Sequence, residues 1–337
     1  MKLLLKIVAA IVGVVVALAA GLVIFVFVNA TRPSRPVGFQ QAVVTDAGHD
    51  PITVSIWYPT DSKPGLVFLG SSAQRVASKG RVEGAALPLV IISHGTGGAA
   101  LSHVDTALAL AEAGFVVVAP THPGDNFRDD SAVGTSGWLV DRSRHVSRVA
   151  DFMLMTWRDR GHLDGAKVGL FGFSAGATTA LISIGGTPDL GRVETQCAAH
   201  PEFVCELRKP GAPLKDPGPA GWTHDPRISA AVIAAPGLGF TFEPNGLSGV
   251  TAAVQLWSGA ADQTVPYATN AGTVARLLPT PPEAHIVPSA GHYAFLPPCR
   301  IGPPMLCKDG PGFDRVAFHK DFNARVVAFF KARLGVR

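Results

Sequence analysis

The sequence predicts an α/β fold in which a mostly parallel sheet is covered by helices on both faces. After about residue 37, short runs rich in β-branched and aromatic residues alternate with longer stretches of helical periodicity. Several of the short runs are continuously hydrophobic, as strands buried on both faces require. With 337 residues, the chain has enough material for one large domain with insertions.

The first thirty residues are set apart by their composition. Residues 7–28 are 22 consecutive apolar or glycine residues, and Lys2 and Lys6 precede them. As a helix this run would be about 33 Å long, enough to cross a hydrocarbon core of about 30 Å. We therefore predict that residues 1–30 form an uncleaved signal anchor. A cleaved signal peptide is the alternative, because residues 28–30 resemble a cleavage site.

Either form of this segment implies export. The domain would face the periplasm or the extracellular side on a membrane anchor, or would be secreted if the signal is removed. Arg32 and Arg35 nearly balance the two lysines ahead of the apolar run, so the positive-inside rule leaves the orientation open. Residues 31–36 are polar and proline-rich, and we expect them to link the helix to a domain at 37–337.

The four cysteines fit an oxidising compartment. Cys197 precedes Cys205 and Cys299 precedes Cys307, each with C-x7-C spacing in loop-like, proline-rich sequence. Of the three possible connectivities we predict the local one, Cys197–Cys205 and Cys299–Cys307. Free or metal-binding thiols are the alternative. We expect no metal site, because neither pair has the C-x2-C spacing typical of zinc.

Within the domain, each element is predicted from its hydrophobic pattern. The expected strands are residues 52–58, 87–93, 115–119, 167–173, 228–235, 252–257 and 284–287. The expected helices are residues 101–113, 140–157, 175–183, 268–278 and 318–332. The segment 185–227 is rich in proline and glycine and breaks this alternation. Because a loop of this length is usually functional, we interpret it as a lid or cap, with a surface excursion as the alternative.

The charge pattern argues against a nucleic-acid partner. The formal net charge is +4, and no run of lysine or arginine forms a stripe that could neutralise a row of phosphates. Neither composition nor patterning indicates an oligomeric state.

A G-x-S-x-G motif marks the candidate nucleophile. Gly172-Phe173-Ser174-Ala175-Gly176 lies between a predicted strand and a predicted helix. In this motif the serine occupies a strained turn, and the glycines let strand and helix approach closely enough to expose its hydroxyl. A chance match is the alternative in a chain with 37 glycines. The strand-to-helix context favours Ser174 as a nucleophile.

A serine hydroxyl needs a base and an orienting carboxylate, in the chain order Ser, Asp or Glu, His. Asp262 and His292 each follow one of the two successive predicted strands after residue 252. We predict that Asp262 orients the imidazole and that His292 takes and returns the proton of Ser174. The alternatives are a helix-capping or turn aspartate and a hydrogen-bonded loop histidine.

A tetrahedral intermediate also needs backbone N–H donors for its oxyanion. The turn Ser93-His94-Gly95-Thr96-Gly97-Gly98 follows a predicted strand, and we assign the donors to the N–H groups of Thr96 and Ala175. A glycine-rich turn that binds nothing is the alternative. His122, after the strand 115–119, and Tyr293 are candidates for contact with substrate, although 122–126 also fits a structural turn.

Two rival functions come from other classes. Residues 95–100 also satisfy G-x-G-x-x-A, a dinucleotide-binding fingerprint. That nicotinamide-dependent oxidoreductase would need an acidic residue near the end of the next strand, where residues 118–122 read Val-Ala-Pro-Thr-His. A catalytically inactive binding module is the other rival, and the complete set Ser174, Asp262 and His292 disfavours it.

Taken in order, Ser-His-Gly-Thr-Gly-Gly, Gly-Phe-Ser-Ala-Gly, Gly-Ala-Ala-Asp and Gly-His-Tyr resemble the motifs of the predicted dienelactone hydrolases of bacteria. That group has the α/β-hydrolase fold and is similar to the secreted platelet-activating factor acetylhydrolases, serine esterases that release short acyl groups. Dienelactone hydrolases proper use a cysteine where this chain has Ser174. The acetylhydrolases take their acid from the strand after the nucleophile's helix, where this chain has Ala234-Ala235-Pro236.

We therefore expect a carboxylic ester hydrolase of EC 3.1.1 type. The substrate would be a small-molecule ester with a short acyl chain, cleaved through an acyl-enzyme intermediate. We expect no cofactor, because the serine, the histidine and the backbone donors supply every step.

Overall fold

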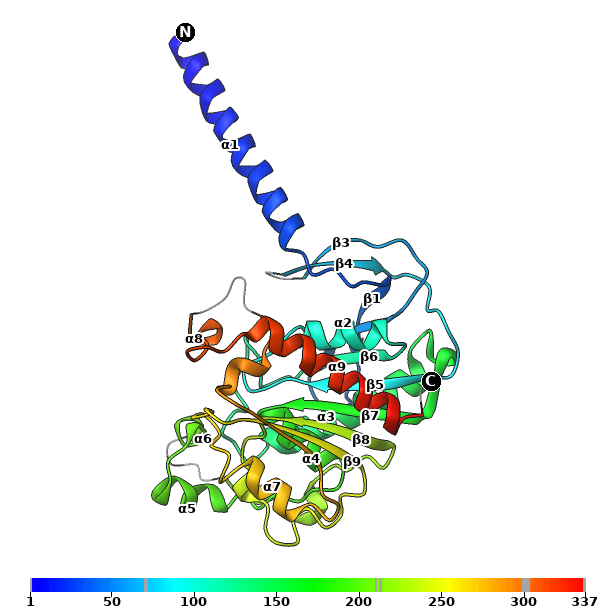
Figure 1. Ribbon diagram of the computed structural model, residues 1–337, viewed down its shortest axis with the longest axis vertical. Helices are drawn as coiled ribbons and strands as arrows, with labels where there is room; N and C mark the ends of the chain where they lie inside the picture. Colours follow the sequence, from blue (N-terminus) through cyan, green and yellow to red (C-terminus); the bar gives the residue numbers. More distant parts are fainter. Residues whose placement is uncertain (1, 70–71, 210, 212–213, 299–303, 336–337) are drawn as a thin grey trace.

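The structure is a computed structural model that describes residues 2–69, 72–209, 211, 214–298 and 304–335 (Figure 1). Ten strands form one sheet in the order β10-β9-β8-β7-β5-β6-β2-β1-β4-β3. The strands are β1 (Val37–Val44), β2 (Ile52–Pro59), β3 (Gly65–Leu69), β4 (Ser72–Ser78), β5 (Leu87–Ser93), β6 (Val116–Thr121), β7 (Leu163–Phe173), β8 (Ile228–Ala234), β9 (Ala253–Gly259) and β10 (Glu283–Val287). The six strands from β10 to β6 are parallel, whereas β2 pairs antiparallel with β6 and β1.

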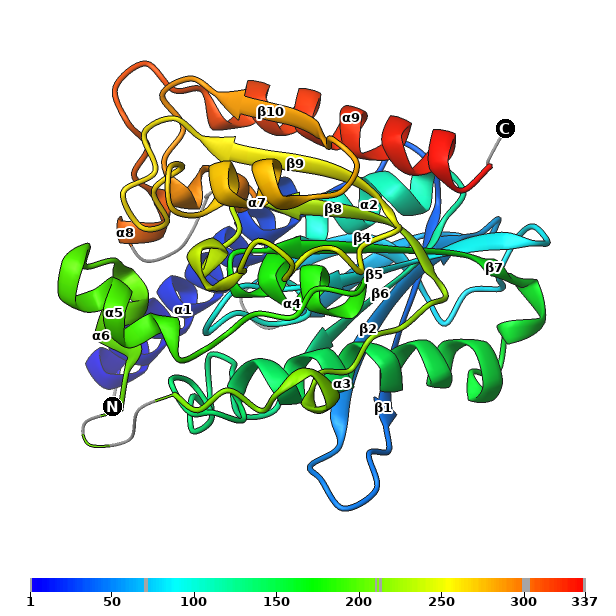
Figure 2. The same ribbon diagram turned by 90° about the horizontal axis from the view of Figure 1, so that it is seen from below.

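Helices cover both faces of the parallel strands (Figure 2). The helices are α1 (Lys2–Asn29), α2 (Val104–Glu112), α3 (Trp138–Asp151), α4 (Ala175–Ser183), α5 (Arg192–Ala199), α6 (Phe203–Leu207), α7 (Ala271–Leu277), α8 (Pro304–Cys307) and α9 (Arg315–Arg333). One buried cluster joins α3, α4 and α7 to the sheet, and another joins α2 and α9 to its opposite face. The predicted fold class is thereby confirmed.

The expected elements reappear with shifted ends. All seven expected strands are present, and β1, β3 and β4 extend the sheet beyond the expected set. The helix expected at 140–157 ends as α3 at Asp151 and continues as a π-helical turn over Phe152–Thr156. The segment 185–227, expected as a lid, contains two short helices, α5 and α6, which lie beyond one end of the parallel strands (Figures 1 and 2).

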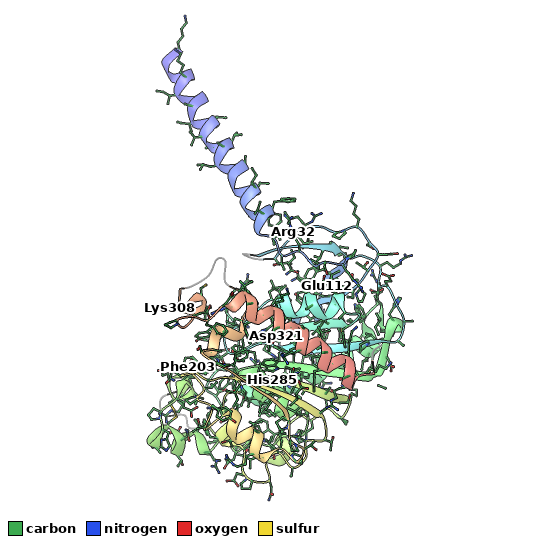
Figure 3. All side chains as sticks on the ribbon, in the orientation of Figure 1. Arg32, Glu112, Phe203, His285, Lys308 and Asp321 are labelled. Atoms are coloured by element: carbon green, nitrogen blue, oxygen red, sulfur yellow. A yellow bond between two sulfur atoms is a disulfide. The ribbon has the colours of Figure 1, made fainter. Side chains whose placement is uncertain are left out.

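The N-terminal helix α1 projects away from the domain (Figure 1). Its apolar part, Lys6–Val28, is long and apolar enough to cross a membrane, and none of its most hydrophobic window is buried. Immediately after it, Thr31 pairs with β4, and the backbone N–H groups of Ser34 and Arg35 donate to the carboxylate of Glu112 in α2. Figure 3 shows Arg32 and Glu112 at the base of this helix.

One of the two predicted disulfides lies wholly within the described residues. Cys197 in α5 is bonded to Cys205 in α6, as predicted. The predicted pair Cys299–Cys307 includes Cys299, which lies outside the described residues.

A buried histidine, His103, packs between the sheet and α2. Its ring lies 5.1 Å from the ring of Phe171 and 5.2 Å from that of Phe173, and the residue is 1% exposed. Neither ring nitrogen has a hydrogen-bond partner among the described residues. Burial lowers the pKa of His103 from 6.5 to about 4, because the imidazolium would lose its hydration without a direct partner.

We expect this histidine to weaken the fold in acid. Below pH 6.5 the unfolded chain binds a proton at this position that the folded protein takes up only near pH 4, so the free energy of unfolding falls as the pH drops through this range. His103→Leu should reduce the acid-side slope by up to about 1.4 kcal/mol per pH unit. Thermal melting between pH 7 and 4 measures this, with exposed His200→Leu as control. Equal slopes in His103→Leu and wild type would contradict it.

Candidate active site

The backbone at Ser174 is held in a conformation that non-glycine residues rarely adopt. Ser174 has φ 55° and ψ −120° between β7 and α4. A Cβ on Gly172 would lie 2.1 Å from the carbonyl oxygen of Gly176, and one on Gly176 would lie 2.0 Å from that of Ser93. Both positions therefore require glycine, and their close contacts force the sharp turn that exposes the serine hydroxyl.

The structure brings Ser174, His292 and Asp262 into one hydrogen-bonded chain. His292 Nε2 lies 3.0 Å from Ser174 Oγ, and His292 Nδ1 lies 2.8 Å from Asp262 Oδ2. Because the carboxylate accepts the proton of Nδ1, the lone pair of Nε2 is directed at the serine hydroxyl. His292 is 6% exposed and Asp262 4% exposed. This geometry allows the imidazole to receive the Ser174 proton.

Asp262 is fixed by the loop that carries it. Its Oδ1 accepts the backbone N–H groups of Thr264 and Val265, each at 2.9 Å, so Oδ2 remains for His292. The loop follows β9, and His292 follows β10, next to it in the sheet. Residues 234–236, which stand where the acetylhydrolase pattern has its acid, contain no acid, and the carboxylate bonded to His292 is that of Asp262, after the later strand β9.

Two backbone N–H groups near Ser174 have no internal acceptor among the described residues. Neither the Thr96 nor the Ala175 N–H has a hydrogen-bond acceptor within the described part of the chain. The turn packs directly on the nucleophile, because a Cβ on Gly95 would lie 3.2 Å from Ser174 Cβ. The next N–H group, that of Gly97, is already donated to Asp125 at 2.8 Å. The free pair can therefore bind an oxyanion formed at Ser174.

A mainly apolar pocket adjoins Ser174. Its wall comes from the turn 93–98, named the oxyanion turn after its expected role, and from the start of α3, α6 and the loops after β8 and β9. The lining residues are Thr96, Trp138, Ser174, Ala175, Glu202, Phe203, Val204, Leu207, Gly237, Leu238, Thr264 and Val265. The segment 185–227 thus forms one side of this pocket, and its residue Phe203 lies at the edge of the molecule (Figure 3).

The α6 side of the pocket is fastened at two points, Cys205 and Glu202. The disulfide joins α6 to α5, and the carboxylate of Glu202, just before α6, accepts Asn270 Nδ2 at 2.8 Å and also the hydroxyl of Thr269. Gln196 Nε2 donates to the same carboxylate at 2.9 Å. These contacts join α6 to residues 269–270, so the pocket wall is attached to the chain that follows Asp262.

The two residues expected to contact substrate lie differently. His122 is fully buried, and its Nε2 lies 3.0 Å from Ser93 Oγ while its Nδ1 lies 3.2 Å from His145 Nδ1. It therefore braces the oxyanion turn from behind and does not line the pocket. Tyr293 stacks edge-on against His292, with ring centroids 5.4 Å apart, and burial, followed by the charge of Asp262, raises its pKa.

Sequence reasoning missed the pocket wall. The expected cap segment 185–227 does supply Glu202 and Leu207 to this wall, but its sequence did not single out either residue, and Trp138 comes from a segment that gave no functional signal. Within the described residues no group of three or more histidines, cysteines or acids is arranged to hold a metal ion.

Comparison with known proteins identifies similar sequences and folds. The sequence model of the dienelactone hydrolase family matches residues 76–215, which include the oxyanion turn and Ser174. A search of curated proteins found no match to the sequence. Among solved structures, the ferulic acid esterase from Streptomyces cinnamoneus is similar with a TM-score of 0.64 at 18% identity, over 91% of this chain and 94% of that one. The chain thus has the α/β-hydrolase fold and resembles dienelactone hydrolases.

Proposed function

We propose that this α/β-hydrolase-fold protein is a serine esterase that cleaves small-molecule carboxylic esters. The supporting observation is the hydrogen-bonded chain from Ser174 through His292 to Asp262, beside two free backbone N–H groups. The family match and the esterase with the same fold favour ester hydrolysis over the other reactions of this fold.

The reaction has two steps. Ser174 Oγ attacks the carbonyl carbon while His292 Nε2 takes its proton, and the N–H groups of Thr96 and Ala175 hold the oxyanion. The tetrahedral intermediate collapses, and the alcohol leaves with the proton from His292. Water then attacks the acyl carbon while His292 takes one of its protons. Collapse of the second tetrahedral intermediate breaks the bond from the acyl carbon to Ser174 Oγ and releases the acid, and His292 returns the proton to Ser174 Oγ. Asp262 stabilises the imidazolium in both steps.

Serine labelling tests this function. We expect a fluorophosphonate to add to wild-type protein at one site, Ser174, and to abolish hydrolysis of p-nitrophenyl acetate, because only an activated serine reacts. Intact-protein and peptide mass spectrometry measure the adduct. Ser174→Ala should lose both labelling and activity, whereas exposed Ser248→Ala should keep both.

Two results would contradict the proposal. Equal labelling of wild type and Ser174→Ala would place the reactive group elsewhere. A correctly folded wild-type protein that is not labelled and hydrolyses no p-nitrophenyl ester would favour the inactive binding module.

We propose that the pocket beside Ser174 holds a short acyl group. The side chains of Trp138, Val204, Leu207 and Leu238 close it with apolar surface, and the disulfide holds α6 in place. A longer chain would need this wall to move. The segment 185–227 then acts as a fixed cap that sets acyl-chain length.

Shortening the wall should change chain-length preference. In a p-nitrophenyl ester series, we expect wild-type kcat/KM to fall beyond short acyl chains and Leu207→Ala to shift the optimum to longer ones. Each extra methylene buried should contribute about 0.8 kcal/mol, or roughly fourfold. Leu214→Ala is a matched control, because Leu214 is 5% exposed in the same apolar cluster but does not line the pocket. An identical shift in both variants would refute the assignment.

We further propose that α1 anchors the domain to a membrane, outside the cytoplasm. Its apolar length and the Cys197–Cys205 disulfide support this location, since structural disulfides persist in oxidising compartments. The full chain should remain in membranes after extraction with alkaline carbonate, and a chain starting at residue 31 should not. Release of both in soluble form at unchanged mass would exclude an anchor; release after loss of about thirty residues would indicate a cleaved signal.

A further inference from the structure

A buried ion pair lies directly behind the oxyanion turn. Arg142 in α3 and Asp125, after β6, are each 1% exposed, and Arg142 Nη1 donates to Asp125 Oδ2 at 2.6 Å. Removing two charges from water is costly, and a well-packed apolar pair often serves stability as well. Stability alone therefore does not explain why a charged pair lies at this position.

Each partner of the pair holds one end of the turn. The guanidinium of Arg142 donates to the backbone carbonyl of His94 and, at 3.2 Å, to Ser93 Oγ. Asp125 Oδ1 accepts the backbone N–H of Gly97 at 2.8 Å. Thr96, whose N–H group has no internal acceptor among the described residues, lies between the two points of attachment. The ion pair thus fixes the peptide on each side of a proposed oxyanion donor.

The same two side chains reach the pocket and the nucleophile's helix. Asp125 Oδ2 accepts Trp138 Nε1 at 2.6 Å, and Trp138 lines the pocket beside Ser174. Arg142 Nε donates to Thr179 Oγ1 in α4 at 3.0 Å. The pair therefore connects the oxyanion turn, the pocket wall and the helix that follows the nucleophile.

The charges of the pair are maintained in this buried setting. Burial opposes ionisation of Asp125, but the charge of Arg142 and hydrogen bonds from Trp138 and Gly97 outweigh it, so the pKa of Asp125 lies below its ordinary value. Burial and then the charge of Arg142 lower the pKa of neighbouring His94 to about 3, which keeps this imidazole neutral at pH 7. Burial also lowers the pKa of Arg142, and the charge of Asp125 with its hydrogen bond opposes that shift. A guanidinium keeps its proton in proteins, so the pair carries both charges.

We propose that Arg142 and Asp125 are positioning residues for the oxyanion hole, and that they align the Thr96 N–H with Ser174 and with the pocket wall at Trp138. This role rests on the proposed esterase function. Preorganised donors stabilise the transition state more than the bound substrate, because the oxyanion forms only after attack. Loss of the pair should therefore lower kcat and leave KM nearly unchanged.

Substitution of Arg142 tests this role. Loss of one oxyanion donor costs roughly 10²- to 10³-fold in kcat, so we expect Arg142→Met to lose about tenfold to 10³-fold in kcat with KM within about threefold. Arg142→Lys keeps the charge but lacks the planar guanidinium that reaches Asp125 and His94 together. Its kcat should lie between those of Arg142→Met and wild type. If Arg142→Met does not fold, Asp125→Asn takes its place, because it retains the shape of the side chain. It should likewise lower kcat and leave KM nearly unchanged.

A transition-state analogue separates positioning from folding. An alkyl boronic acid forms a tetrahedral adduct with the serine, so its Ki should rise in the variants in parallel with the loss of kcat/KM. Arg227→Met is the control, because Arg227 pairs with Asp225, 2% exposed, just before the amino end of β8. This control should lower thermal stability and leave kcat and boronate Ki unchanged.

The outcomes distinguish the two proposals. Folded Arg142→Met or Asp125→Asn with wild-type kcat, or with boronate Ki unchanged, would overturn the positioning role while the esterase remains active. A wild-type protein without activity or labelling would instead overturn the esterase function itself.

Discussion

The left-handed backbone at Ser174 is the constraint on which the rest of the site depends. Such a conformation costs on the order of 1–3 kcal/mol for a non-glycine residue and persists only where its surroundings impose it. Here the surroundings are backbone contacts that leave no room for a Cβ at Gly172 or Gly176. Because Gly176 lies against the carbonyl of Ser93, the same contact that exposes the hydroxyl also fixes the start of the oxyanion turn.

Around this turn the site is assembled from loops that the parallel sheet brings to one edge. His292 and Asp262 arrive from neighbouring strands, and the pocket wall arrives from the segment 185–227, fastened by a disulfide and by Glu202. The Arg142–Asp125 pair adds a second support, behind the turn. The proposed chemistry therefore needs little rearrangement of the protein, because the proposed nucleophile, base and N–H donors already lie close to one another.

The sequence predicted the parallel core, and it indicated that Ser174, Asp262 and His292 would lie together, because both depend on local signals: continuous hydrophobic strands, each followed by a polar loop. It missed β1, β3 and β4. In β1 and β4 the mixed polar composition, including Gln40 and Arg75, gives no continuous hydrophobic run. It also missed Arg142, because a charged residue on a helix is normally read as exposed, and its burial depends on Asp125, seventeen residues earlier. Pocket walls and buried polar pairs arise from tertiary packing, for which periodicity carries no signal.

A crystal structure of the phosphonylated protein would show whether the site works as proposed. We expect phosphorus bonded to Ser174 Oγ and the phosphoryl oxygen about 2.7–3.1 Å from the backbone nitrogens of both Thr96 and Ala175. We also expect His292 within hydrogen-bond distance of the adduct and still bonded to Asp262. A phosphoryl oxygen directed into solvent, or an adduct on another residue, would contradict the proposed mechanism.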